Sequence, residues 1–449
     1  SKFMEIFDVT ILLIAFTLIF KNRIKDRMNK ILLTFGIIAS IIQILEVGYK
    51  WQFIPIYLIF LSSVTVISLR IKYENKFLKG ISLLIMTLLL IFSTVLIYFL
   101  PIPEFTIQDK KYSVSYEEFS VSIDDRPQPK AFYELSNLDA SGNRELLVDV
   151  YYPSTSSTEP IQLFRNADTN WGKTIVKYLN RTWGISLPEF FLSHLNLSYF
   201  DIGKDLKRLD NKSPIVIYTH GWAGEKIFAT DQLITIASQG YVVIALDHTG
   251  LSMFTELPSG TIYNTGSTAE STNVYEVMNQ MSLDIQDVIN YFIKADYPAD
   301  FSDISVIGHS TGGGSGYLYC KSNPCSSLIL QDPFFTPLVE NNIDIDLNTE
   351  SYFIYSEDWY LGYQDTDNLT EMDVLKNYIS SSTSYFTYYM RDSRHYDFVA
   401  FGVISPLAKY SFLKGSIDYI DSLKVNNYFN LASIKKEVIR ETEYLKFIP

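Results

Sequence analysis

Cysteine and histidine are scarce in this chain of 449 residues, which has two of the first and five of the second. Cys320 and Cys325 lack the His or Cys neighbours of a zinc site, so the spacing argues against structural zinc. The pair could form one small disulfide if this part of the chain lies outside the cytoplasm, or remain two unpaired thiols near a helix end. No motif in the sequence implies a metal or a cofactor.

Positive charge is scarce beyond the first hundred residues. Residues 1–100 carry 11 Lys/Arg against 5 Asp/Glu, a net charge of +6, whereas the remainder carries a net charge of −19. An acidic body repels phosphate groups, so we expect no nucleic-acid partner.

The basic first part of the chain contains four apolar runs: Ile6–Phe20, Ile31–Leu45, Phe53–Leu69 and Ile81–Leu100. Their lengths approach the roughly 20 residues that a helix needs to cross a bilayer. No run carries a cluster of ionisable residues, which indicates an anchor rather than a transport path. We therefore predict four transmembrane helices within residues 1–101.

The charges between these runs predict their orientation. The segments Lys21–Lys30 and Arg70–Lys79 are rich in Lys and Arg, whereas the turn Val47–Gln52 has Lys50 alone. By the positive-inside rule the two basic segments are cytoplasmic, and four crossings then place everything after Pro101 outside. The Ile/Lys/Asn/Tyr-rich composition suggests a bacterial source. We expect a multi-pass protein of the bacterial cell membrane with an extracytoplasmic catalytic part.

A different pattern begins after Pro101. Residues 102–126 are expected to be a linker and first strand, and residues 127–449 an α/β domain. Helix candidates, Asp231–Gln239 and Tyr275–Ile293, alternate with short β-rich runs, several of them continuously apolar. This alternation predicts a mainly parallel sheet flanked by helices. The predicted strands are Leu146–Tyr152, Ile215–Thr219, Val242–Asp247, Ile304–Ile307, Ser327–Gln331, Tyr352–Tyr355 and Tyr385–Met390.

The central motif is Gly-His-Ser-Thr-Gly at residues 308–312, which directly follows the predicted strand Ile304–Ile307. A strand, a glycine-rich turn and a helix form the context in which a nucleophile elbow presents a serine above a sheet. We therefore predict that Ser310 is a catalytic nucleophile.

The Ser310 hydroxyl needs a base and an acid partner. Hydrolases of this topology order their triad Ser, acid, His, and His395 is the only histidine that follows Ser310. Two acids end predicted strands in the right part of the chain, Asp332 and Asp358, and the residues alone leave both open.

An oxyanion hole needs two backbone N–H groups. One should belong to Thr311, the residue after the nucleophile. The other should come from the loop His220–Gly224, where Trp222 is the expected donor. The ring of His220 is expected to brace this loop rather than to transfer protons.

These motifs resemble the plasma-type platelet-activating factor acetylhydrolases and, more loosely, bacterial lipases of the same fold. The resemblance covers roughly residues 112–420 and rests on the strand segment 149–153, the loop His220–Gly224, the elbow, Asp332, the Ser356-Glu357 pair and His395. It implies an α/β-hydrolase fold and assigns the acid to Asp332, because that family's acid follows the strand after the elbow helix. It also implies a short or oxidised acyl group on a membrane-associated ester. The chain departs from the family in its membrane helices and in the bulk of Trp222.

The sequence thus predicts a membrane-anchored serine ester hydrolase, an esterase or lipase, whose partners are a membrane and a lipid or small ester. Ser310, Asp332 and His395 would form the triad, and Trp222 and Thr311 the oxyanion hole. Two alternatives stay open. One is an acyltransferase on cell-envelope substrates, and the other is a catalytically idle membrane-assembly module, whose expected signature, a missing triad member, is not seen. No protein partner is indicated.

Overall fold

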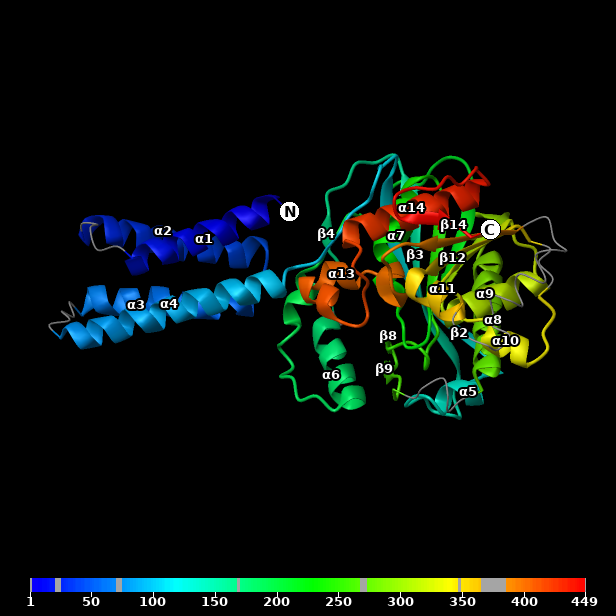
Figure 1. The fold of residues 1–449 in the computed structure, drawn as a ribbon, viewed down its shortest axis with the longest axis horizontal. Helices are drawn as coiled ribbons and strands as arrows, with labels where there is room; N and C mark the ends of the chain where they lie inside the picture. The colour runs from blue at the N-terminus through cyan, green and yellow to red at the C-terminus, as the bar shows by residue number, and fades with distance from the viewer. Residues whose placement is uncertain are drawn as a thin grey trace.

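The computed structural model describes residues 2–20, 26–69, 75–167, 170–266, 273–345, 349–364 and 385–448. A bundle of helices at the N-terminus extends to one side of a larger α/β body (Figure 1). The bundle consists of α1 (Lys2–Phe20), α2 (Asp26–Glu46), the 3₁₀ turn η1 (Trp51–Phe53), α3 (Ile54–Ser68) and α4 (Lys76–Phe99).

Three helices of the bundle are long and apolar enough to cross a membrane: Arg27–Glu46, Trp51–Ser68 and Lys76–Phe99. The fourth predicted span corresponds to a shorter apolar helix, Ile6–Phe20. Only 33%, 33% and 11% of the three apolar windows is buried inside the protein. Helices that are apolar on their outer faces are typical of a lipid environment. Of the two basic segments, residues 21–25 and 70–74 lie outside the described residues.

Among the described residues of the bundle, Asp8 and Lys50 form an ion pair that the apolar pattern did not indicate. Lys50 Nζ lies 2.7 Å from Asp8 Oδ2, and Gln43 Nε2 donates to Asp8 Oδ1 at 2.5 Å. Asp8 and Lys50 are 42 positions apart in the sequence. The pair ties α1 to the connection between α2 and η1, at the end of the bundle that meets the α/β body.

Two sets of contacts join the bundle to the α/β body. The guanidinium of Arg165 donates to Glu46 O and to Leu45 O, both at 2.6 Å. These carbonyls end α2 and have no partner within the helix, so Arg165 caps that helix from the other part of the protein.

The second set of contacts lies at η1 and at the end of α4. Trp51 Nε1 donates to Phe191 O at 3.1 Å, and Ser405 Oγ donates to Phe99 O at 2.6 Å. The bundle is therefore held by side chains from several separate segments of the body, and not by the connecting chain alone.

A nine-stranded sheet forms the centre of the body, in the order β14-β13-β12-β11-β10-β6-β7-β3-β2. Neighbouring strands from β7 to β13 run parallel, and the strands at both edges are antiparallel. All seven predicted strands are present, and the body has the α/β architecture expected. The strands are β2 (Ser113–Pro127), β3 (Asn143–Ser154), β6 (Pro214–Thr219), β7 (Val242–Asp247), β10 (Asp300–His309), β11 (Ser327–Gln331), β12 (Ser351–Ser356), β13 (Tyr385–Met390) and β14 (Leu445–Phe447).

Helices cover both faces of this sheet, because alternate strand residues point to opposite sides. Ile307 of β10 packs into the core beneath α7 (Thr230–Ser238) and α14 (Tyr419–Lys435). Its neighbour Val306 packs beneath α8 (Val274–Lys294) and α9 (Thr311–Ser322). Both side chains are fully buried, which contributes about 1.5–3 kcal/mol each.

Shorter elements surround this core. The small strands are β1 (Glu104–Phe105), β4 (Ile161–Gln162), β5 (Tyr199–Phe200), β8 (Phe254–Leu257) and β9 (Gly260–Tyr263). The short helices are α5 (Lys130–Tyr133), α6 (Trp171–Trp183), α10 (Thr336–Glu340), α11 (Glu357–Gln364) and α13 (Phe401–Ile404). The 3₁₀ turns are η2 (Ser193–Leu197), η3 (Lys226–Ala229), η5 (His395–Phe398) and η6 (Pro406–Tyr410).

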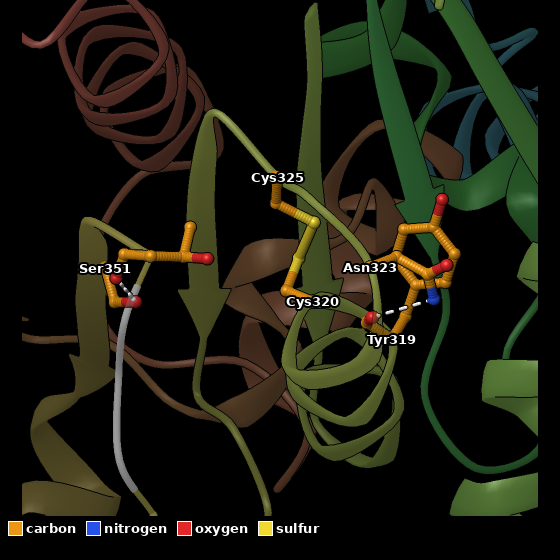
Figure 2. Close-up of a disulfide and its surroundings, with 6 residues drawn as sticks. Tyr319, Cys320, Asn323, Cys325 and Ser351 are labelled. Atoms are coloured by element: carbon orange, nitrogen blue, oxygen red, sulfur yellow. Dashed lines mark hydrogen bonds between the residues drawn. A yellow bond between two sulfur atoms is a disulfide. The ribbon is translucent and has the colours of Figure 1, made fainter. Parts of the chain in front are cut away.

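The two cysteines form a disulfide between the last turn of α9 and the connection to β11 (Figure 2). Their Cα atoms are 5.5 Å apart, and Asn323, between them, donates to Tyr319 O at 3.0 Å. Of the two alternatives left open by the sequence, the structure contains the disulfide. Disulfides persist in oxidising compartments, so this bond fits a location outside the cytoplasm.

Candidate active site

Ser310 lies at the turn between β10 and α9, where the sequence predicts a nucleophile elbow. Its φ of 57° and ψ of −123° are unusual for a residue with a side chain. The turn is possible because its flanking residues are glycines. A Cβ atom on Gly308 would lie 2.4 Å from Gly312 O, and one on Gly312 would lie 2.2 Å from Thr219 O. Larger residues at these positions would push the turn open.

The structure brings Ser310, His395 and Asp332 into one chain of hydrogen bonds. His395 Nε2 lies 2.9 Å from Ser310 Oγ, and His395 Nδ1 lies 2.8 Å from Asp332 Oδ2. Asp332 follows β11 and His395 begins η5, so both side chains come from the carboxyl ends of parallel strands. Asp332 is completely buried, whereas Ser310 is 8% exposed. Residues separated by 85 positions therefore meet at one edge of the sheet.

The surroundings of Asp332 fix the hydrogen-bond directions in this chain. Ser356 N donates to Asp332 Oδ1 at 2.8 Å, and Ser356 Oγ donates to Asp332 Oδ2 at 2.7 Å. An ionised carboxylate only accepts, so Nδ1 of His395 is the donor and Nε2 accepts the proton of the Ser310 hydroxyl. Asp358, the alternative acid, is exposed, and its backbone N–H donates to Ser393 O at 3.4 Å.

The predicted oxyanion loop lies directly against Ser310. A Cβ atom on Gly221 would lie 2.8 Å from Ser310 Cβ, so the loop approaches this closely only because it has a glycine there. Trp222 and Thr311 both line the cavity that contains Ser310. Thr311 is the first residue of α9, where backbone N–H groups have no partner inside the helix. The next amide of the loop, that of Ala223, donates to Leu251 O at 3.1 Å.

Comparisons with known proteins agree with this architecture. The family model of platelet-activating factor acetylhydrolase, isoform II, matches residues 136–257. A ferulic acid esterase from Streptomyces cinnamoneus has a similar structure, with a TM-score of 0.60 and 17% sequence identity over 77% of this chain and 99% of that chain. The chain has an α/β-hydrolase-like fold, and over residues 136–257 it resembles the platelet-activating factor acetylhydrolases. These similarities support a carboxylic ester hydrolase.

Two further comparisons add little to this assignment. A putative dienelactone hydrolase from Klebsiella pneumoniae matches over 72% of this chain and 99% of its own, with 13% identity and a TM-score of 0.39, too low to support an argument. No curated protein sequence matched the chain. At such low identity the structural likeness establishes the fold alone.

A buried network supports the predicted oxyanion loop. His220 Nδ1 donates to Gly221 O at 2.7 Å, and His220 Nε2 accepts from His248 N at 3.0 Å and from Ser252 Oγ at 2.8 Å. These partners require a neutral ring. Burial, followed by the neighbouring His248, lowers the pKa of His220 to about 4, which agrees with that requirement.

The network continues to a buried ion pair. His248 Nδ1 lies 2.9 Å from Asp284 Oδ2, and His248 Nε2 lies 2.9 Å from Thr219 Oγ1. Arg144 binds both oxygens of Asp284, from Nε at 2.9 Å and from Nη2 at 2.7 Å. His248 and Asp284 thus hold Thr219, the residue that precedes the predicted oxyanion loop.

His309, the neighbour of Ser310, supports His395. Its Nε2 lies 3.1 Å from the backbone oxygen of His395, and the two ring centroids are 4.7 Å apart. Burial, and then the positive charge that His395 can carry, hold the pKa of His309 well below its usual value. A neutral His309 can donate from Nε2 to the His395 carbonyl and so fix the position of η5.

The cavity around Ser310 has a volume of about 260 Å³. Most of its wall is aromatic or apolar, including Trp222, Phe334, Trp359, Phe228 and Phe401. Within the described ranges, no group of three or more His, Cys, Asp or Glu side chains is arranged to hold a metal ion.

Glu225 lines the cavity but was not singled out from the sequence. The sequence places Trp359 among the aromatic residues of the loops around the site, but its stacking on His395 is seen only in the structure. For Glu225 a local signal existed, because an acid directly after the glycines of an oxyanion loop must lie close to the reacting group.

Proposed function

We propose that this enzyme is a membrane-anchored serine esterase that hydrolyses short-acyl or lipid esters through Ser310, His395 and Asp332. The observation that carries the proposal is the continuous hydrogen-bond chain from Asp332 through His395 to Ser310 Oγ, with distances of 2.8 and 2.9 Å. Those distances lie within the range in which a base can accept the proton of a nucleophile.

The proposed reaction has two halves. Ser310 Oγ attacks the ester carbonyl while His395 Nε2 takes the hydroxyl proton, and Asp332 stabilises the imidazolium that forms. The backbone N–H groups of Trp222 and Thr311 stabilise the oxyanion. His395 then gives its proton to the leaving alcohol. In the second half a water molecule, activated by His395, releases the acid and restores Ser310.

The membrane part of the proposal rests on the bundle and its flanking charges. Residues 1–101 would form an anchor of four helices, 102–126 a linker and first strand, and 127–449 the catalytic domain. The apolar outer faces of three helices support crossings, and the disulfide between Cys320 and Cys325 supports an extracytoplasmic catalytic domain. The proposed location is the bacterial cell membrane.

The proposed substrate is a membrane-associated ester with a short or oxidised acyl group. A cavity of about 260 Å³ with a largely aromatic wall has little room for a long chain. The bulk of Trp222 beside the nucleophile would crowd long acyl groups most. Apolar pockets discriminate by only about 1–3 kcal/mol per methylene, so the preference should be graded.

The test is a series of p-nitrophenyl esters from two to sixteen carbons, together with phospholipids, assayed with the purified full-length protein. We expect kcat/KM to be highest for the shortest chains. A maximum at long chains would instead identify a true lipase. Activity near zero on every member would contradict the proposal and favour the acyltransferase alternative.

A further inference from the structure

Two buried polar groups in the wall of the active-site cavity have no partner in the protein. Glu225 and Tyr218 both line the cavity that contains Ser310, and they are 7% and 1% exposed. Neither Glu225 Oε2 nor the Tyr218 hydroxyl has a hydrogen-bond partner among the described residues. A buried polar atom without a partner costs roughly 1–3 kcal/mol, so such atoms in a native protein call for an explanation.

A third group lies beside Glu225. The indole of Trp171 is close enough to Glu225 to favour its charged form, yet Trp171 Nε1 is itself buried without a completed hydrogen bond. Trp171 packs against Phe228, another residue of the cavity wall, with ring centroids 6.0 Å apart. An unsatisfied donor next to an unsatisfied carboxyl forms a polar spot in a largely aromatic wall.

The charges around Glu225 indicate which form of the carboxyl is present. Burial, and then the neighbouring Asp247, raise the pKa of Glu225 well above its usual value. Lys226 opposes this shift, but its ammonium already lies 3.0 Å from Asp247 and 3.4 Å from Asp149. A neutral carboxyl can both donate and accept a hydrogen bond.

We propose that Glu225 and Tyr218 form a polar subsite that selects esters carrying a hydroxyl or ether oxygen close to the ester group. A substrate hydroxyl or ether oxygen can form a hydrogen bond with either group and so satisfy it. A purely apolar acyl or alcohol group would leave them unpaired, and the aspartates around Lys226 disfavour an anion. The inference rests on the proposed esterase function and narrows its substrate class.

The experiment uses the full-length protein and two matched substrate pairs. One pair, p-nitrophenyl butyrate and p-nitrophenyl 3-hydroxybutyrate, places the hydroxyl on the acyl side. The other pair, propyl butyrate and glyceryl monobutyrate, places it on the alcohol side. We expect kcat/KM to favour the hydroxylated member of at least one pair by roughly tenfold to a hundredfold, the range for leaving a buried polar group unpaired. Equal values within both pairs would overturn the inference.

Variants then assign the preference to this subsite. Glu225→Leu should lose it, whereas Glu225→Gln should keep most of it, because the amide still donates and accepts. Val399→Ala, a change in the apolar wall of the same cavity, should shift both members of a pair alike. A Glu225→Leu enzyme that retained the full preference would refute the role of Glu225.

Labelling of Ser310 by a fluorophosphonate separates the two proposals. Labelling together with ester turnover but without selectivity removes the polar subsite and leaves the esterase intact. Absence of both labelling and turnover in the unaltered protein removes the esterase proposal itself. Labelling of Glu225→Leu shows that this variant is folded.

Discussion

The ring of Trp359 stacks on the imidazole of His395, with centroids 4.2 Å apart and planes inclined by 12°. Trp359 N also donates to Ser356 Oγ at 3.2 Å, and Ser356 Oγ donates to Asp332. The indole therefore holds the imidazole from its face, while Asp332 holds it from its edge.

This stack predicts a moderate kinetic effect. Trp359→Leu should lower kcat for p-nitrophenyl acetate by about threefold to tenfold, because aromatic pairs contribute about 0.5–1.5 kcal/mol beyond their buried area. Trp359→Phe keeps a ring at this position and should retain most of the rate. Steady-state kinetics would decide, and equal rates for all three proteins would show that the stack does not orient His395.

Substitution of the two candidate acids should have opposite effects on turnover. Asp332→Asn should reduce turnover by about four orders of magnitude, since an amide opposite Nδ1 favours the wrong imidazole tautomer. Asp358→Asn is the matched control and should change turnover little, because Asp358 is exposed. If the two variants ranked the other way round, the acid would be Asp358.

Covalent labelling tests the nucleophile directly. A fluorophosphonate probe should add once to the intact protein, because reaction requires an activated serine and an oxyanion hole. Intact-protein mass spectrometry should show no adduct in Ser310→Ala. Persistent labelling of that variant would place the nucleophile elsewhere.

The network beneath the oxyanion loop predicts a large effect on stability. Asp284→Asn should reduce the free energy of unfolding by about 3–5 kcal/mol, because it leaves Arg144 buried without its counter-ion. Arg126 Nη1 lies 2.7 Å from both Asp284 Oδ1 and Asp287 Oδ2. Asp287→Asn therefore removes one of its two partners, but the Asp287 side chain is 23% exposed and should matter less. Thermal unfolding in detergent would compare the two, and a similar melting temperature for both would contradict this reasoning.

The proposed orientation predicts which cysteines an impermeant maleimide can reach on intact cells. Lys207→Cys, at an exposed position of the α/β body, should be labelled without permeabilisation. Lys76→Cys, at the start of α4, should be labelled only afterwards. The unaltered protein serves as the blank, because both native cysteines are in the disulfide. Labelling in the reverse order would invert the topology.

The parallel part of the sheet could be predicted from the sequence, because strands buried on both faces read as continuous apolar runs. Val242–Asp247 and Ser327–Gln331 were located to the residue for this reason. The edge strand β14 and the hairpin of β8 and β9 were not predicted, because strands of three or four partly exposed residues give little hydropathy pattern.

The residues of the site likewise divide into those that the sequence indicated and those that it did not. Ser310 and His395 could be proposed from a local motif and from chain order, and Asp332 needed a family resemblance to choose it. The contact between Arg144 and Asp284 joins residues 140 positions apart, and no local sequence pattern indicates it. Trp359 and Glu225 likewise acquire their significance only from the folded chain.

The cap that Arg165 places on α2 has a consequence for how the enzyme meets its substrate. With the bundle in a bilayer, as proposed, the contacts of Arg165 with α2 would limit the swing of the α/β body, so that the mouth of the cavity would stay near one height and tilt. The search for substrate then reduces to lateral diffusion in a plane. The cavity would then encounter molecules at the same height above the bilayer repeatedly. Molecules at another depth would first have to move to that height.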